Sequence, residues 1–310
     1  MTGGCGFIGS HLVENLVASG HSVRILDDLS TGTRENCHEC AELIVGDVAD
    51  PFVAGSAMRD MDGCFHLAAI ASVQKSIDQW LETHRVNASG TVSILSAARL
   101  NKTSKPIPVV FASSAAVYGH TQARAVTEKH RTSPISAYGA DKLASELHAA
   151  VATKIFDIPT TALRFFNVYG PRQDPSSPYS GVLSIFLKKI LDGHHVTVFG
   201  SGQQSRDFIF IDDVVLALSS AMYKHTNRFN VYNVCTGKPT SLLQALSAIM
   251  DVTNISATVR FESAREGDIM HSLGSNDLLR KELNISPQHS IHNGIEKTIN
   301  YMRKINVISN

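Results

Sequence analysis

The sequence predicts an α/β protein built on a doubly wound parallel sheet, with the first strand largely missing and a smaller α/β lobe near the C-terminus. Short apolar stretches alternate with helix-like stretches over residues 1–165, the order typical of parallel βαβ units. A glycine-rich turn at residues 3–9 leads directly into the first helical pattern. These observations indicate the Rossmann arrangement, with a dinucleotide-binding domain over 1–165. The alternation then breaks, so we expect 166–310 to form mainly a substrate-binding lobe, with 207–235 returning to the first domain.

The turn at residues 3–9 has the chemistry of a phosphate site. It reads Gly-x-x-Gly-x-x-Gly, and the helical pattern that follows it stops at Gly20. Glycines let the backbone approach a pyrophosphate, and the start of a helix directs N–H groups and the positive end of its dipole at an anion. Such a glycine pattern alone is weak evidence, because it also occurs in ordinary turns. We expect the cofactor to contact Gly3, Gly6, Phe7, Ile8 and Gly9.

The strand that should precede this turn is the unusual feature of the chain. In a dinucleotide-binding fold the glycine turn follows a buried parallel strand, yet only Met1 precedes Thr2. We therefore expect the first strand to be almost absent. The preferred explanation is a start placed too late; the alternative is that another segment covers the gap.

Acidic and small residues end the strands expected after the turn. Asp27 closes the stretch 23–28, where it would accept hydrogen bonds from the adenosine ribose and repel a 2′-phosphate, which favours NAD over NADP. Asp47 closes the next strand and suits the adenine amino group. Small residues at the end of the stretch 64–69 leave room for the cofactor. The further cofactor contacts that we expect are Val48, Leu67, Ala68 and Ala69.

Three residues form the candidate catalytic group. Tyr138 and Lys142 are one helical turn apart and so share a face, and we expect Leu143, Leu147 and Val151 to form the opposite, core-facing stripe. A phenol normally titrates near pH 10, and a nearby ammonium together with a positive nicotinamide would bring it towards working pH. Ser114, at the end of the preceding apolar strand, can hydrogen-bond the same sugar hydroxyl.

The composition excludes several classes of function. The 28 basic and 28 acidic residues cancel, so the chain carries no electrostatic footprint for nucleic acid. The sequence has no apolar run long enough for a membrane span and no signal peptide pattern, so we expect a cytoplasmic protein with no membrane partner.

Cys37 and Cys40 form a CxxC, for which a redox pair or half a zinc site competes with two reduced surface thiols. No second Cys/His pair with zinc spacing follows, so we expect no metal.

In family order, these motifs resemble the extended short-chain dehydrogenase/reductases, and specifically the UDP-hexose 4-epimerases. The resemblance extends over nearly the whole chain and includes the stretches 113–119, 163–171, 200–208 and 265–269. It implies a homodimer and tightly bound NAD, in nucleotide-sugar metabolism of the kind that serves polysaccharide biosynthesis. The chain departs from the family at Cys5, where Ala or Ser is usual, and at Gly274-Ser275, where Ala-Asp is frequent.

The resemblance also implies roles for individual residues. Tyr138 would take the proton of the sugar 4-hydroxyl, and Lys142 would lower the Tyr138 pKa and hold the nicotinamide ribose. Ser114 would share the hydrogen bond to the 4-oxygen. The remaining implied contacts are Phe166 beside the nicotinamide, Asn167 near the substrate diphosphate, and Arg206 and Arg265 clamping that diphosphate.

Two sequence details bear on the reaction. Related dehydratases and decarboxylases carry an acid beside Ser114, whereas this chain has Ala115 and Ala116, which favours C4 epimerisation of UDP-glucose and UDP-galactose. In the family a bulky Tyr at the position of Ser272 excludes an N-acetyl group, so the serine favours activity on UDP-GlcNAc and UDP-GalNAc as well. The alternatives are an NAD-dependent nucleotide-sugar dehydrogenase or reductase, and a non-catalytic NAD-binding paralogue.

Overall fold

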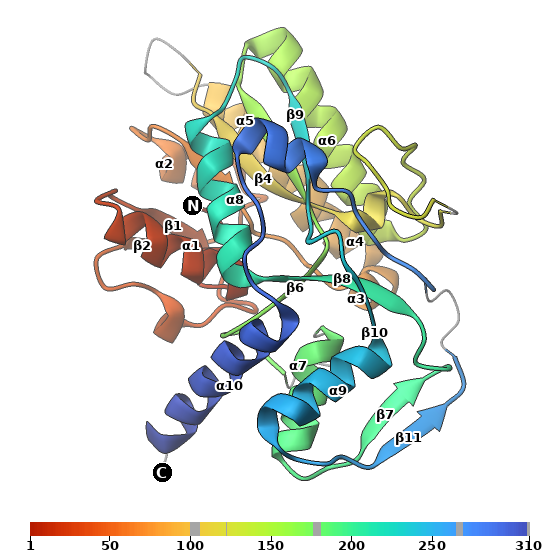
Figure 1. Ribbon diagram of the computed structural model, residues 1–310. Helices are drawn as coiled ribbons and strands as arrows, with labels where there is room; N and C mark the ends of the chain where they lie inside the picture. Colours follow the sequence, from red (N-terminus) through yellow and green to blue (C-terminus); the bar gives the residue numbers. More distant parts are fainter. Residues whose placement is uncertain (100–105, 122, 176–180, 265–268, 309–310) are drawn as a thin grey trace.

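The computed structural model describes residues 1–99, 106–121, 123–175, 181–264 and 269–308. Its main sheet is parallel throughout and confirms the predicted fold class (Figure 1). Four strands pair in the order β3-β4-β5-β9, and β1 pairs with β2. The strands are β1 (Arg24–Asp27), β2 (Glu42–Val45), β3 (Cys64–His66), β4 (Val109–Ser114), β5 (Thr160–Phe165) and β9 (Asn230–Val234).

Residues 1–3 connect the two parts of this sheet. Thr2 forms parallel bridges with both Leu26 of β1 and His66 of β3. Its N–H donates to the Phe65 carbonyl at 2.9 Å, and the Leu26 N–H donates to the Met1 carbonyl at 2.8 Å. The expected first strand is thus reduced to about one bridging residue, which nevertheless makes the hydrogen bonds that keep β1 and β3 in register.

Helices cover both faces of the sheet. On one face α1 (Phe7–Ala18) packs against α8 (Ile211–Tyr223), and fully buried Leu12 and Val13 on α1 belong to the larger hydrophobic core. Gly20, at φ +84°, follows the end of α1. The opposite face carries α2 (Pro51–Met58), α5 (Gly90–Arg99) and α6 (Ala137–Phe156), around a separate core cluster. This double covering is why β3, β4 and β5 are almost entirely buried.

Shorter elements complete the first lobe. Ser136 caps α6 by accepting a hydrogen bond from the Gly139 N–H at 3.1 Å, which fixes where this helix begins. A π-helical turn precedes α5, and α3 and α4 pack beside α6. These elements are α3 (Val73–Asp78), α4 (Trp80–His84), the π-turns Arg85–Ser89 and Leu279–Leu283, and the 3-10 turns Arg34–Asn36 and Ala115–Val117.

The expectation for the buried side of α6 was wrong. Leu147 and Val151 are 62% and 50% exposed, and Leu143 is only partly buried. The face that packs on the sheet carries small and polar side chains instead: Lys142, Ser145, Glu146, Ala149, Ala152 and Thr153. Small residues allow close approach to the strands, so the apolar stripe faces outward.

In the part of the chain that the structure describes, the second lobe contains two small sheets and the helices α7, α9 and α10. β6, β8 and β10 pair in the order β10-β8-β6, and β7 pairs with β11. The chain segment 207–235 crosses back, since α8 packs on α1 and β9 pairs with β5 in the main sheet. The elements are β6 (Asn167–Tyr169), α7 (Val182–Leu191), β7 (Val196–Phe199), β8 (Ser205–Phe210), β10 (Pro239–Ser241), α9 (Leu242–Thr253), β11 (Val259–Glu262) and α10 (Ile291–Ile308).

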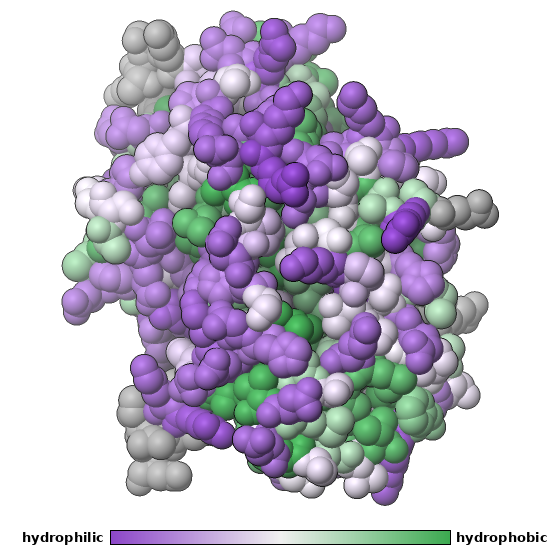
Figure 2. All heavy atoms as spheres, in the orientation of Figure 1, coloured by the Kyte–Doolittle hydropathy of each residue, from purple (hydrophilic) through white to green (hydrophobic). Residues whose placement is uncertain are grey.

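The surface differs between the two lobes. In Figure 2 hydrophilic side chains dominate the upper part of the visible face, whereas apolar side chains gather over the lower right, where α9, β7 and β11 lie in Figure 1. Phe261 on β11 is 58% exposed. Along the described residues, no helix combines the length and the apolar character that a membrane span requires.

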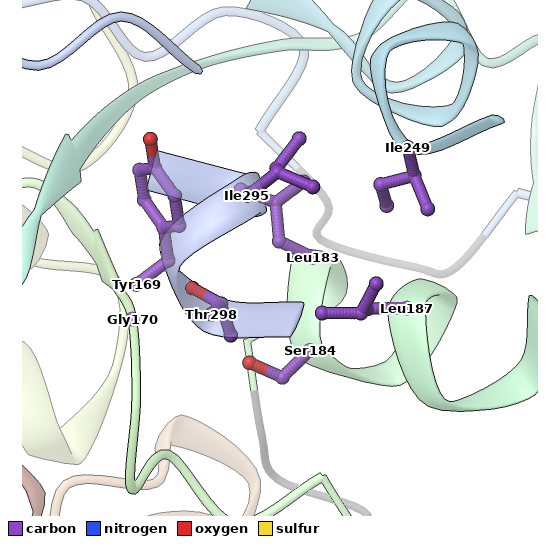
Figure 3. Close-up of a pocket in the computed structure, with 8 residues that line it drawn as sticks. All are labelled: Tyr169, Gly170, Leu183, Ser184, Leu187, Ile249, Ile295 and Thr298. Carbon is purple, nitrogen blue, oxygen red and sulfur yellow. The ribbon is translucent and has the colours of Figure 1, made fainter. Parts of the chain in front are cut away.

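The interior of the second lobe is well packed. Figure 3 shows Leu183 and Leu187 of α7 near Ile249 of α9 and Ile295 of α10, with Tyr169 at one side. The cavity that they surround has a volume of about 10 Å³. That volume is at the lower limit for one water molecule, so this cavity is a packing defect and cannot hold a ligand.

Candidate functional site

The glycine turn is as tight as its sequence predicts. Gly3 has φ +68°, and a Cβ there would lie 2.7 Å from the Ala68 backbone nitrogen. A Cβ on Gly9 would lie 2.0 Å from the Gly3 carbonyl oxygen. No other residue fits either position, because the first glycine packs on the end of β3 and the last lets α1 approach the turn.

The start of α1 has no side-chain cap. Gly6 is the N-cap and supplies no side chain to satisfy the first N–H groups of the helix. A Cβ on Gly6 would approach only the Gly3 carbonyl oxygen, at 3.4 Å. Phe7 and Ile8, the first two residues of the helix, are half-buried. These features fit the pyrophosphate of a dinucleotide.

Asp27 is fixed at the end of β1 beside the turn. Its carboxylate is buried and accepts hydrogen bonds from the N–H groups of Cys5 and Leu29, each at 2.9 Å. One bond goes to each oxygen, and a carboxylate has about four acceptor positions. Asp27 therefore keeps acceptor capacity for the two ribose hydroxyls of an adenosine.

Asp47 lies at the end of β2 with a cationic partner. It accepts a hydrogen bond from the Ala49 N–H at 2.8 Å and forms an ion pair with Arg85. Partial burial alone would raise the pKa of Asp47, but the Ala49 N–H and the Arg85 guanidinium outweigh it and lower the pKa. Val48 is buried against Gly90 of α5. Asp47 is thus ionised, and its binding to an adenine amino group stays a prediction.

A buried hydrogen-bond chain that the sequence did not predict supports the end of β3. His66 shares hydrogen bonds with Thr2 through Nδ1 at 2.8 Å and with Thr91 through Nε2 at 3.1 Å. The Thr2 hydroxyl in turn accepts from the Ala68 N–H. Leu67, Ala68 and Ala69, the expected cofactor contacts, follow directly and are half-buried. Burial, with Lys142 nearby, lowers the pKa of His66 to about 3, so the imidazole is neutral.

Ser114, Tyr138 and Lys142 come together at the carboxyl end of β4. Tyr138 is hydrogen-bonded through its side chain to Ser114, and its backbone N–H donates to the Ser76 hydroxyl at 3.1 Å. Burial raises the pKa of Tyr138, and the hydrogen bond with Ser114 opposes that increase. Without a cofactor the phenol is therefore protonated at neutral pH.

Lys142 is buried one turn along the same helix. Its ammonium donates a hydrogen bond to the Ala112 carbonyl of β4 at 2.9 Å and lies 5.8 Å from the centre of the Tyr138 ring. Burial lowers the pKa of Lys142 to about 8, although the neighbouring Asp141 carboxylate raises it. The Lys142 side chain is thus still mostly charged at pH 7.

Phe166 and Asn167 link the main sheet to the second lobe. The Phe166 N–H donates to the Val234 carbonyl, and its ring packs so closely on Gly274 that a Cβ there would lie 2.6 Å from the ring. Gly274, where Ala is frequent in the family, thus leaves room for the Phe166 ring. Asn167 starts β6 and is half-buried.

The other expected substrate contacts lie around the start of β8. Arg206 is on β8, and its guanidinium donates to the Ser205 carbonyl at 2.9 Å. The same carbonyl accepts a hydrogen bond from the Ser272 N–H at 3.1 Å, so Arg206 and Ser272 are brought together. Arg265 lies outside the described residues.

A larger cleft lies elsewhere on the molecule. It has a volume of about 290 Å³ and runs between α7, α10 and the segment 170–175, with Asn36 at one side. Ser114, Tyr138 and Lys142 do not line it. Within the described ranges, no group of three or more His, Cys, Asp and Glu side chains is arranged to hold a metal ion.

Comparison with known proteins gives the context for this geometry. The model of the NAD dependent epimerase/dehydratase family matches residues 1–235. The UDP-glucose 4-epimerase of Mycolicibacterium smegmatis is 36% identical, over 98% of this chain and 97% of that protein. The crystal structure of a UDP-glucose 4-epimerase from Thermotoga maritima, with UDP-glucose, has a TM-score of 0.93 at 31% identity and covers 98% of both chains.

Other similar proteins are named for a different substrate or a different reaction. A UDP-N-acetylglucosamine 4-epimerase from Methanobrevibacter ruminantium, solved with UDP-N-acetylmuramic acid, has a TM-score of 0.92 at 33% identity and covers 98% of this chain and 97% of that one. A UDP-N-acetyl-alpha-D-glucosaminuronate decarboxylase from Bacillus cytotoxicus is 31% identical, over 98% of this chain and 97% of that protein. Similarity over nearly the full length therefore shows the family without fixing the reaction. The chain belongs to the NAD-dependent epimerase/dehydratase family.

Proposed function

We propose that this protein is an NAD-dependent 4-epimerase of UDP-hexoses. The observation that carries the proposal is the meeting of Ser114, Tyr138 and Lys142 at the carboxyl end of the parallel sheet, the end at which the glycine turn also lies. Ligands of such sheets bind at this end. Relatives named UDP-glucose 4-epimerase, similar over nearly the full chain, support the same reaction.

The cofactor would lie along the residues already described. Gly3, Gly6, Phe7, Ile8 and Gly9 would hold the pyrophosphate, and Asp27 the adenosine ribose. The contacts expected further along the sheet are Asp47, Val48, Leu67, Ala68, Ala69 and Phe166. When bound, NAD supplies a hydride acceptor that can return the hydride to the same sugar carbon.

Proton transfer would be the task of this chain's own side chains. Tyr138 would accept the proton of the 4-hydroxyl and return it after the sugar has presented its other face. The Lys142 ammonium would stabilise the phenolate electrostatically, and Ser114 would hold the 4-oxygen. The high pKa of Tyr138 in the protein without cofactor means that cofactor binding must contribute to its activation.

The residues beside Ser114 favour epimerisation over elimination. A dehydratase or decarboxylase needs an acid or base in addition to the tyrosine, whereas the 3-10 turn after Ser114 carries Ala115 and Ala116. Neither alanine can transfer a proton. Decarboxylases and dehydratases are also among the similar proteins, so the fold does not distinguish these reactions from epimerisation. The distinction rests on the side chains beside Ser114.

The UDP part of the substrate would bind to the second lobe. We assign its diphosphate to Asn167, Arg206 and Arg265, since guanidinium groups pair well with phosphates. Ser272 would face the substituent at C2 of the sugar. Because a serine is small, we expect UDP-GlcNAc and UDP-GalNAc to be accepted along with UDP-glucose and UDP-galactose.

We also propose a homodimer that buries the outer stripe of α6. Leu147, Val151 and Ile155 are 62%, 50% and 63% exposed, and Val92 on the neighbouring α5 is 40% exposed. A row of exposed apolar side chains on one helix, with another on the neighbouring helix, is typical of an interface. Sedimentation of the wild-type chain against Val151→Glu tests this proposal, with a shift to monomer expected in the variant.

A coupled assay with UDP-glucose, UDP-galactose, UDP-GlcNAc and UDP-GalNAc tests the function. Interconversion of C4 epimers without accumulation of NADH is the expected result. Net NADH formation would instead establish a nucleotide-sugar dehydrogenase, and net consumption of added NADH would establish a reductase. NAD binding without turnover of any of the four sugars would indicate a non-catalytic paralogue.

A further inference from the structure

Two cysteine thiols meet at the wall of the proposed adenosine site. Cys5 lies inside the glycine turn and is fully buried, whereas Cys37 follows the 3-10 turn Arg34–Asn36 and is half-buried. The Cys37 thiol lies close enough to Cys5 to help raise the pKa of Cys5. It donates a hydrogen bond to the His38 carbonyl at 3.8 Å, and Cys37 packs against the core cluster that contains Cys5. The thiols are therefore adjacent although they are far apart in the sequence.

The backbone around the two cysteines is tied together as well. The Cys5 carbonyl accepts hydrogen bonds from the Thr33 N–H and from the Asn36 side-chain amide, each at 3.2 Å. Gly32 packs so tightly that a Cβ there would lie 2.8 Å from the Cys5 carbonyl carbon. This contact keeps the segment 29–37 against the glycine turn, and hence keeps the two thiols within reach of each other.

We propose that Cys5 and Cys37 are a redox modification site, at which a reversible disulfide fastens the segment 29–37 to the glycine turn. The disulfide would affect NAD binding because both cysteines lie close to Asp27. The Cys5 N–H bonds to Asp27, the proposed ribose acceptor, and the segment 29–37 borders the same residue through the Leu29 N–H. A covalent link between the turn and this segment restricts the opening needed for the adenosine half of NAD to enter or leave.

Cys37 reacts first because it is more exposed than Cys5. The Cys37 thiolate attacks a low-molecular-weight disulfide, forming a mixed disulfide and releasing one thiolate. The Cys5 thiolate then attacks the Cys37 sulfur and displaces the second thiolate. The two protein thiols together lose two protons and two electrons, and the small disulfide is reduced to two thiols. Burial, assisted by the Asp27 carboxylate, raises the pKa of Cys5 to about 12, which makes the second step slow at neutral pH.

Cys40 is the competing partner for Cys37 and provides the matched control. It is exposed, and its N–H donates to the His38 ring, whereas Cys37 is half-buried and packs against the core cluster that contains Cys5. Oxidation of the CxxC alone would link Cys37 to Cys40 and leave the glycine turn untouched. The Cys5–Cys37 pairing predicts that removing Cys40 changes nothing.

The experiment uses the full chain treated with oxidised glutathione, followed by non-reducing digestion and mass spectrometry. A peptide joining Cys5 to Cys37 is expected in the wild type and in Cys40→Ser, and its absence is expected in Cys37→Ser. The rate of NAD release, followed by exchange with labelled NAD, should fall at least several-fold on oxidation of the wild type and of Cys40→Ser, and recover with dithiothreitol.

Two results would overturn the proposal. One is a Cys37–Cys40 peptide as the main product, or mixed disulfides without a Cys5–Cys37 link. The other is a Cys5–Cys37 link that leaves the NAD release rate unchanged. The proposal uses the proposed cofactor site but not the sugar reaction, so linkage and NAD exchange remain measurable even if no UDP-sugar is turned over.

Discussion

The Lys142 ammonium lies 5.8 Å from the centre of the Tyr138 ring, while its hydrogen bond goes to the Ala112 carbonyl of β4. The lysine is therefore held by the strand that also carries Ser114, with its ammonium over the Tyr138 ring. One helix and one strand thus position all three groups. This arrangement keeps the distances fixed, because both elements are part of the packed core.

Tyr138→Phe should remove turnover while leaving the cofactor bound. The phenol oxygen is the proposed proton acceptor, and loss of general acid–base catalysis typically costs about 10²- to 10⁴-fold in rate. Phenylalanine keeps the ring and its packing. We expect kcat to fall by at least about 10²-fold, measured by the coupled assay, with NAD affinity within a few-fold of wild type by titration. Wild-type turnover in this variant would refute the assignment of the base.

Lys142→Met should inactivate the enzyme, and it should raise the unfolding free energy of the cofactor-free protein. Burial lowers the pKa of Lys142 from 10.5 to about 8, so the folded state binds this proton less tightly than the unfolded state. The difference disfavours folding by about 3 kcal/mol below pH 8 and disappears as the pH rises toward 10.5. We expect a higher Tm at pH 7, and loss of the wild-type increase in unfolding free energy between pH 8 and 10.5. A lower Tm at pH 7 would contradict this account.

The parts of the site that could be predicted from sequence are those encoded locally. The glycine turn, the acid at the end of the next strand and the Tyr138/Lys142 pair each depend on spacing within one or two elements. The steric limits of a glycine turn and the repeat of a helix determine where these residues lie, independently of contacts with the rest of the protein. The structure accordingly brings Ser114, Tyr138 and Lys142 together as the sequence predicts.

The parts that sequence could not predict depend on contacts between distant segments. Periodicity identified an apolar stripe on α6 but could not say which face meets the sheet, and close packing selected the opposite face with Ser145 and Ala149. Glu146 on that face is buried because Arg164 of β5 pairs with it through two hydrogen bonds. The hydrogen bonds from Thr2 through His66 to Thr91 likewise join three separate segments of the sequence.

His66 should make the protein sensitive to acid. Its pKa of about 3 in the folded state is below the ordinary value of 6.5, so the unfolded state binds the proton more readily. Stability is therefore fully present above pH 6.5 and is lost by about 1.4 kcal/mol for each pH unit between 6.5 and 3. His66→Gln should lower stability at pH 7, where its hydrogen bonds are lost, and flatten the decline in acid.

Chemical denaturation of wild type and His66→Gln between pH 7 and 4 measures both effects. His195→Gln provides a matched control, because His195 is exposed. The control should keep the acid slope of the wild type. Equal acid slopes for His66→Gln and wild type would show that another group causes the sensitivity.

Ser272→Tyr should narrow the range of sugars that the enzyme accepts. Ser272 is held beside Arg206 through the Ser205 carbonyl, so a larger side chain there would project close to the proposed diphosphate clamp. A phenol ring would occupy the space needed by an N-acetyl group at C2, but not the space of a hydroxyl. We expect kcat/KM for UDP-GalNAc to fall at least about 10-fold, the scale of steric discrimination worth roughly 1–3 kcal/mol. The same variant assayed with UDP-galactose is its own control and should stay within a few-fold of wild type. Undiminished turnover of UDP-GalNAc would show that Ser272 does not face the C2 substituent, whereas equal losses for both sugars would point to displacement of Arg206.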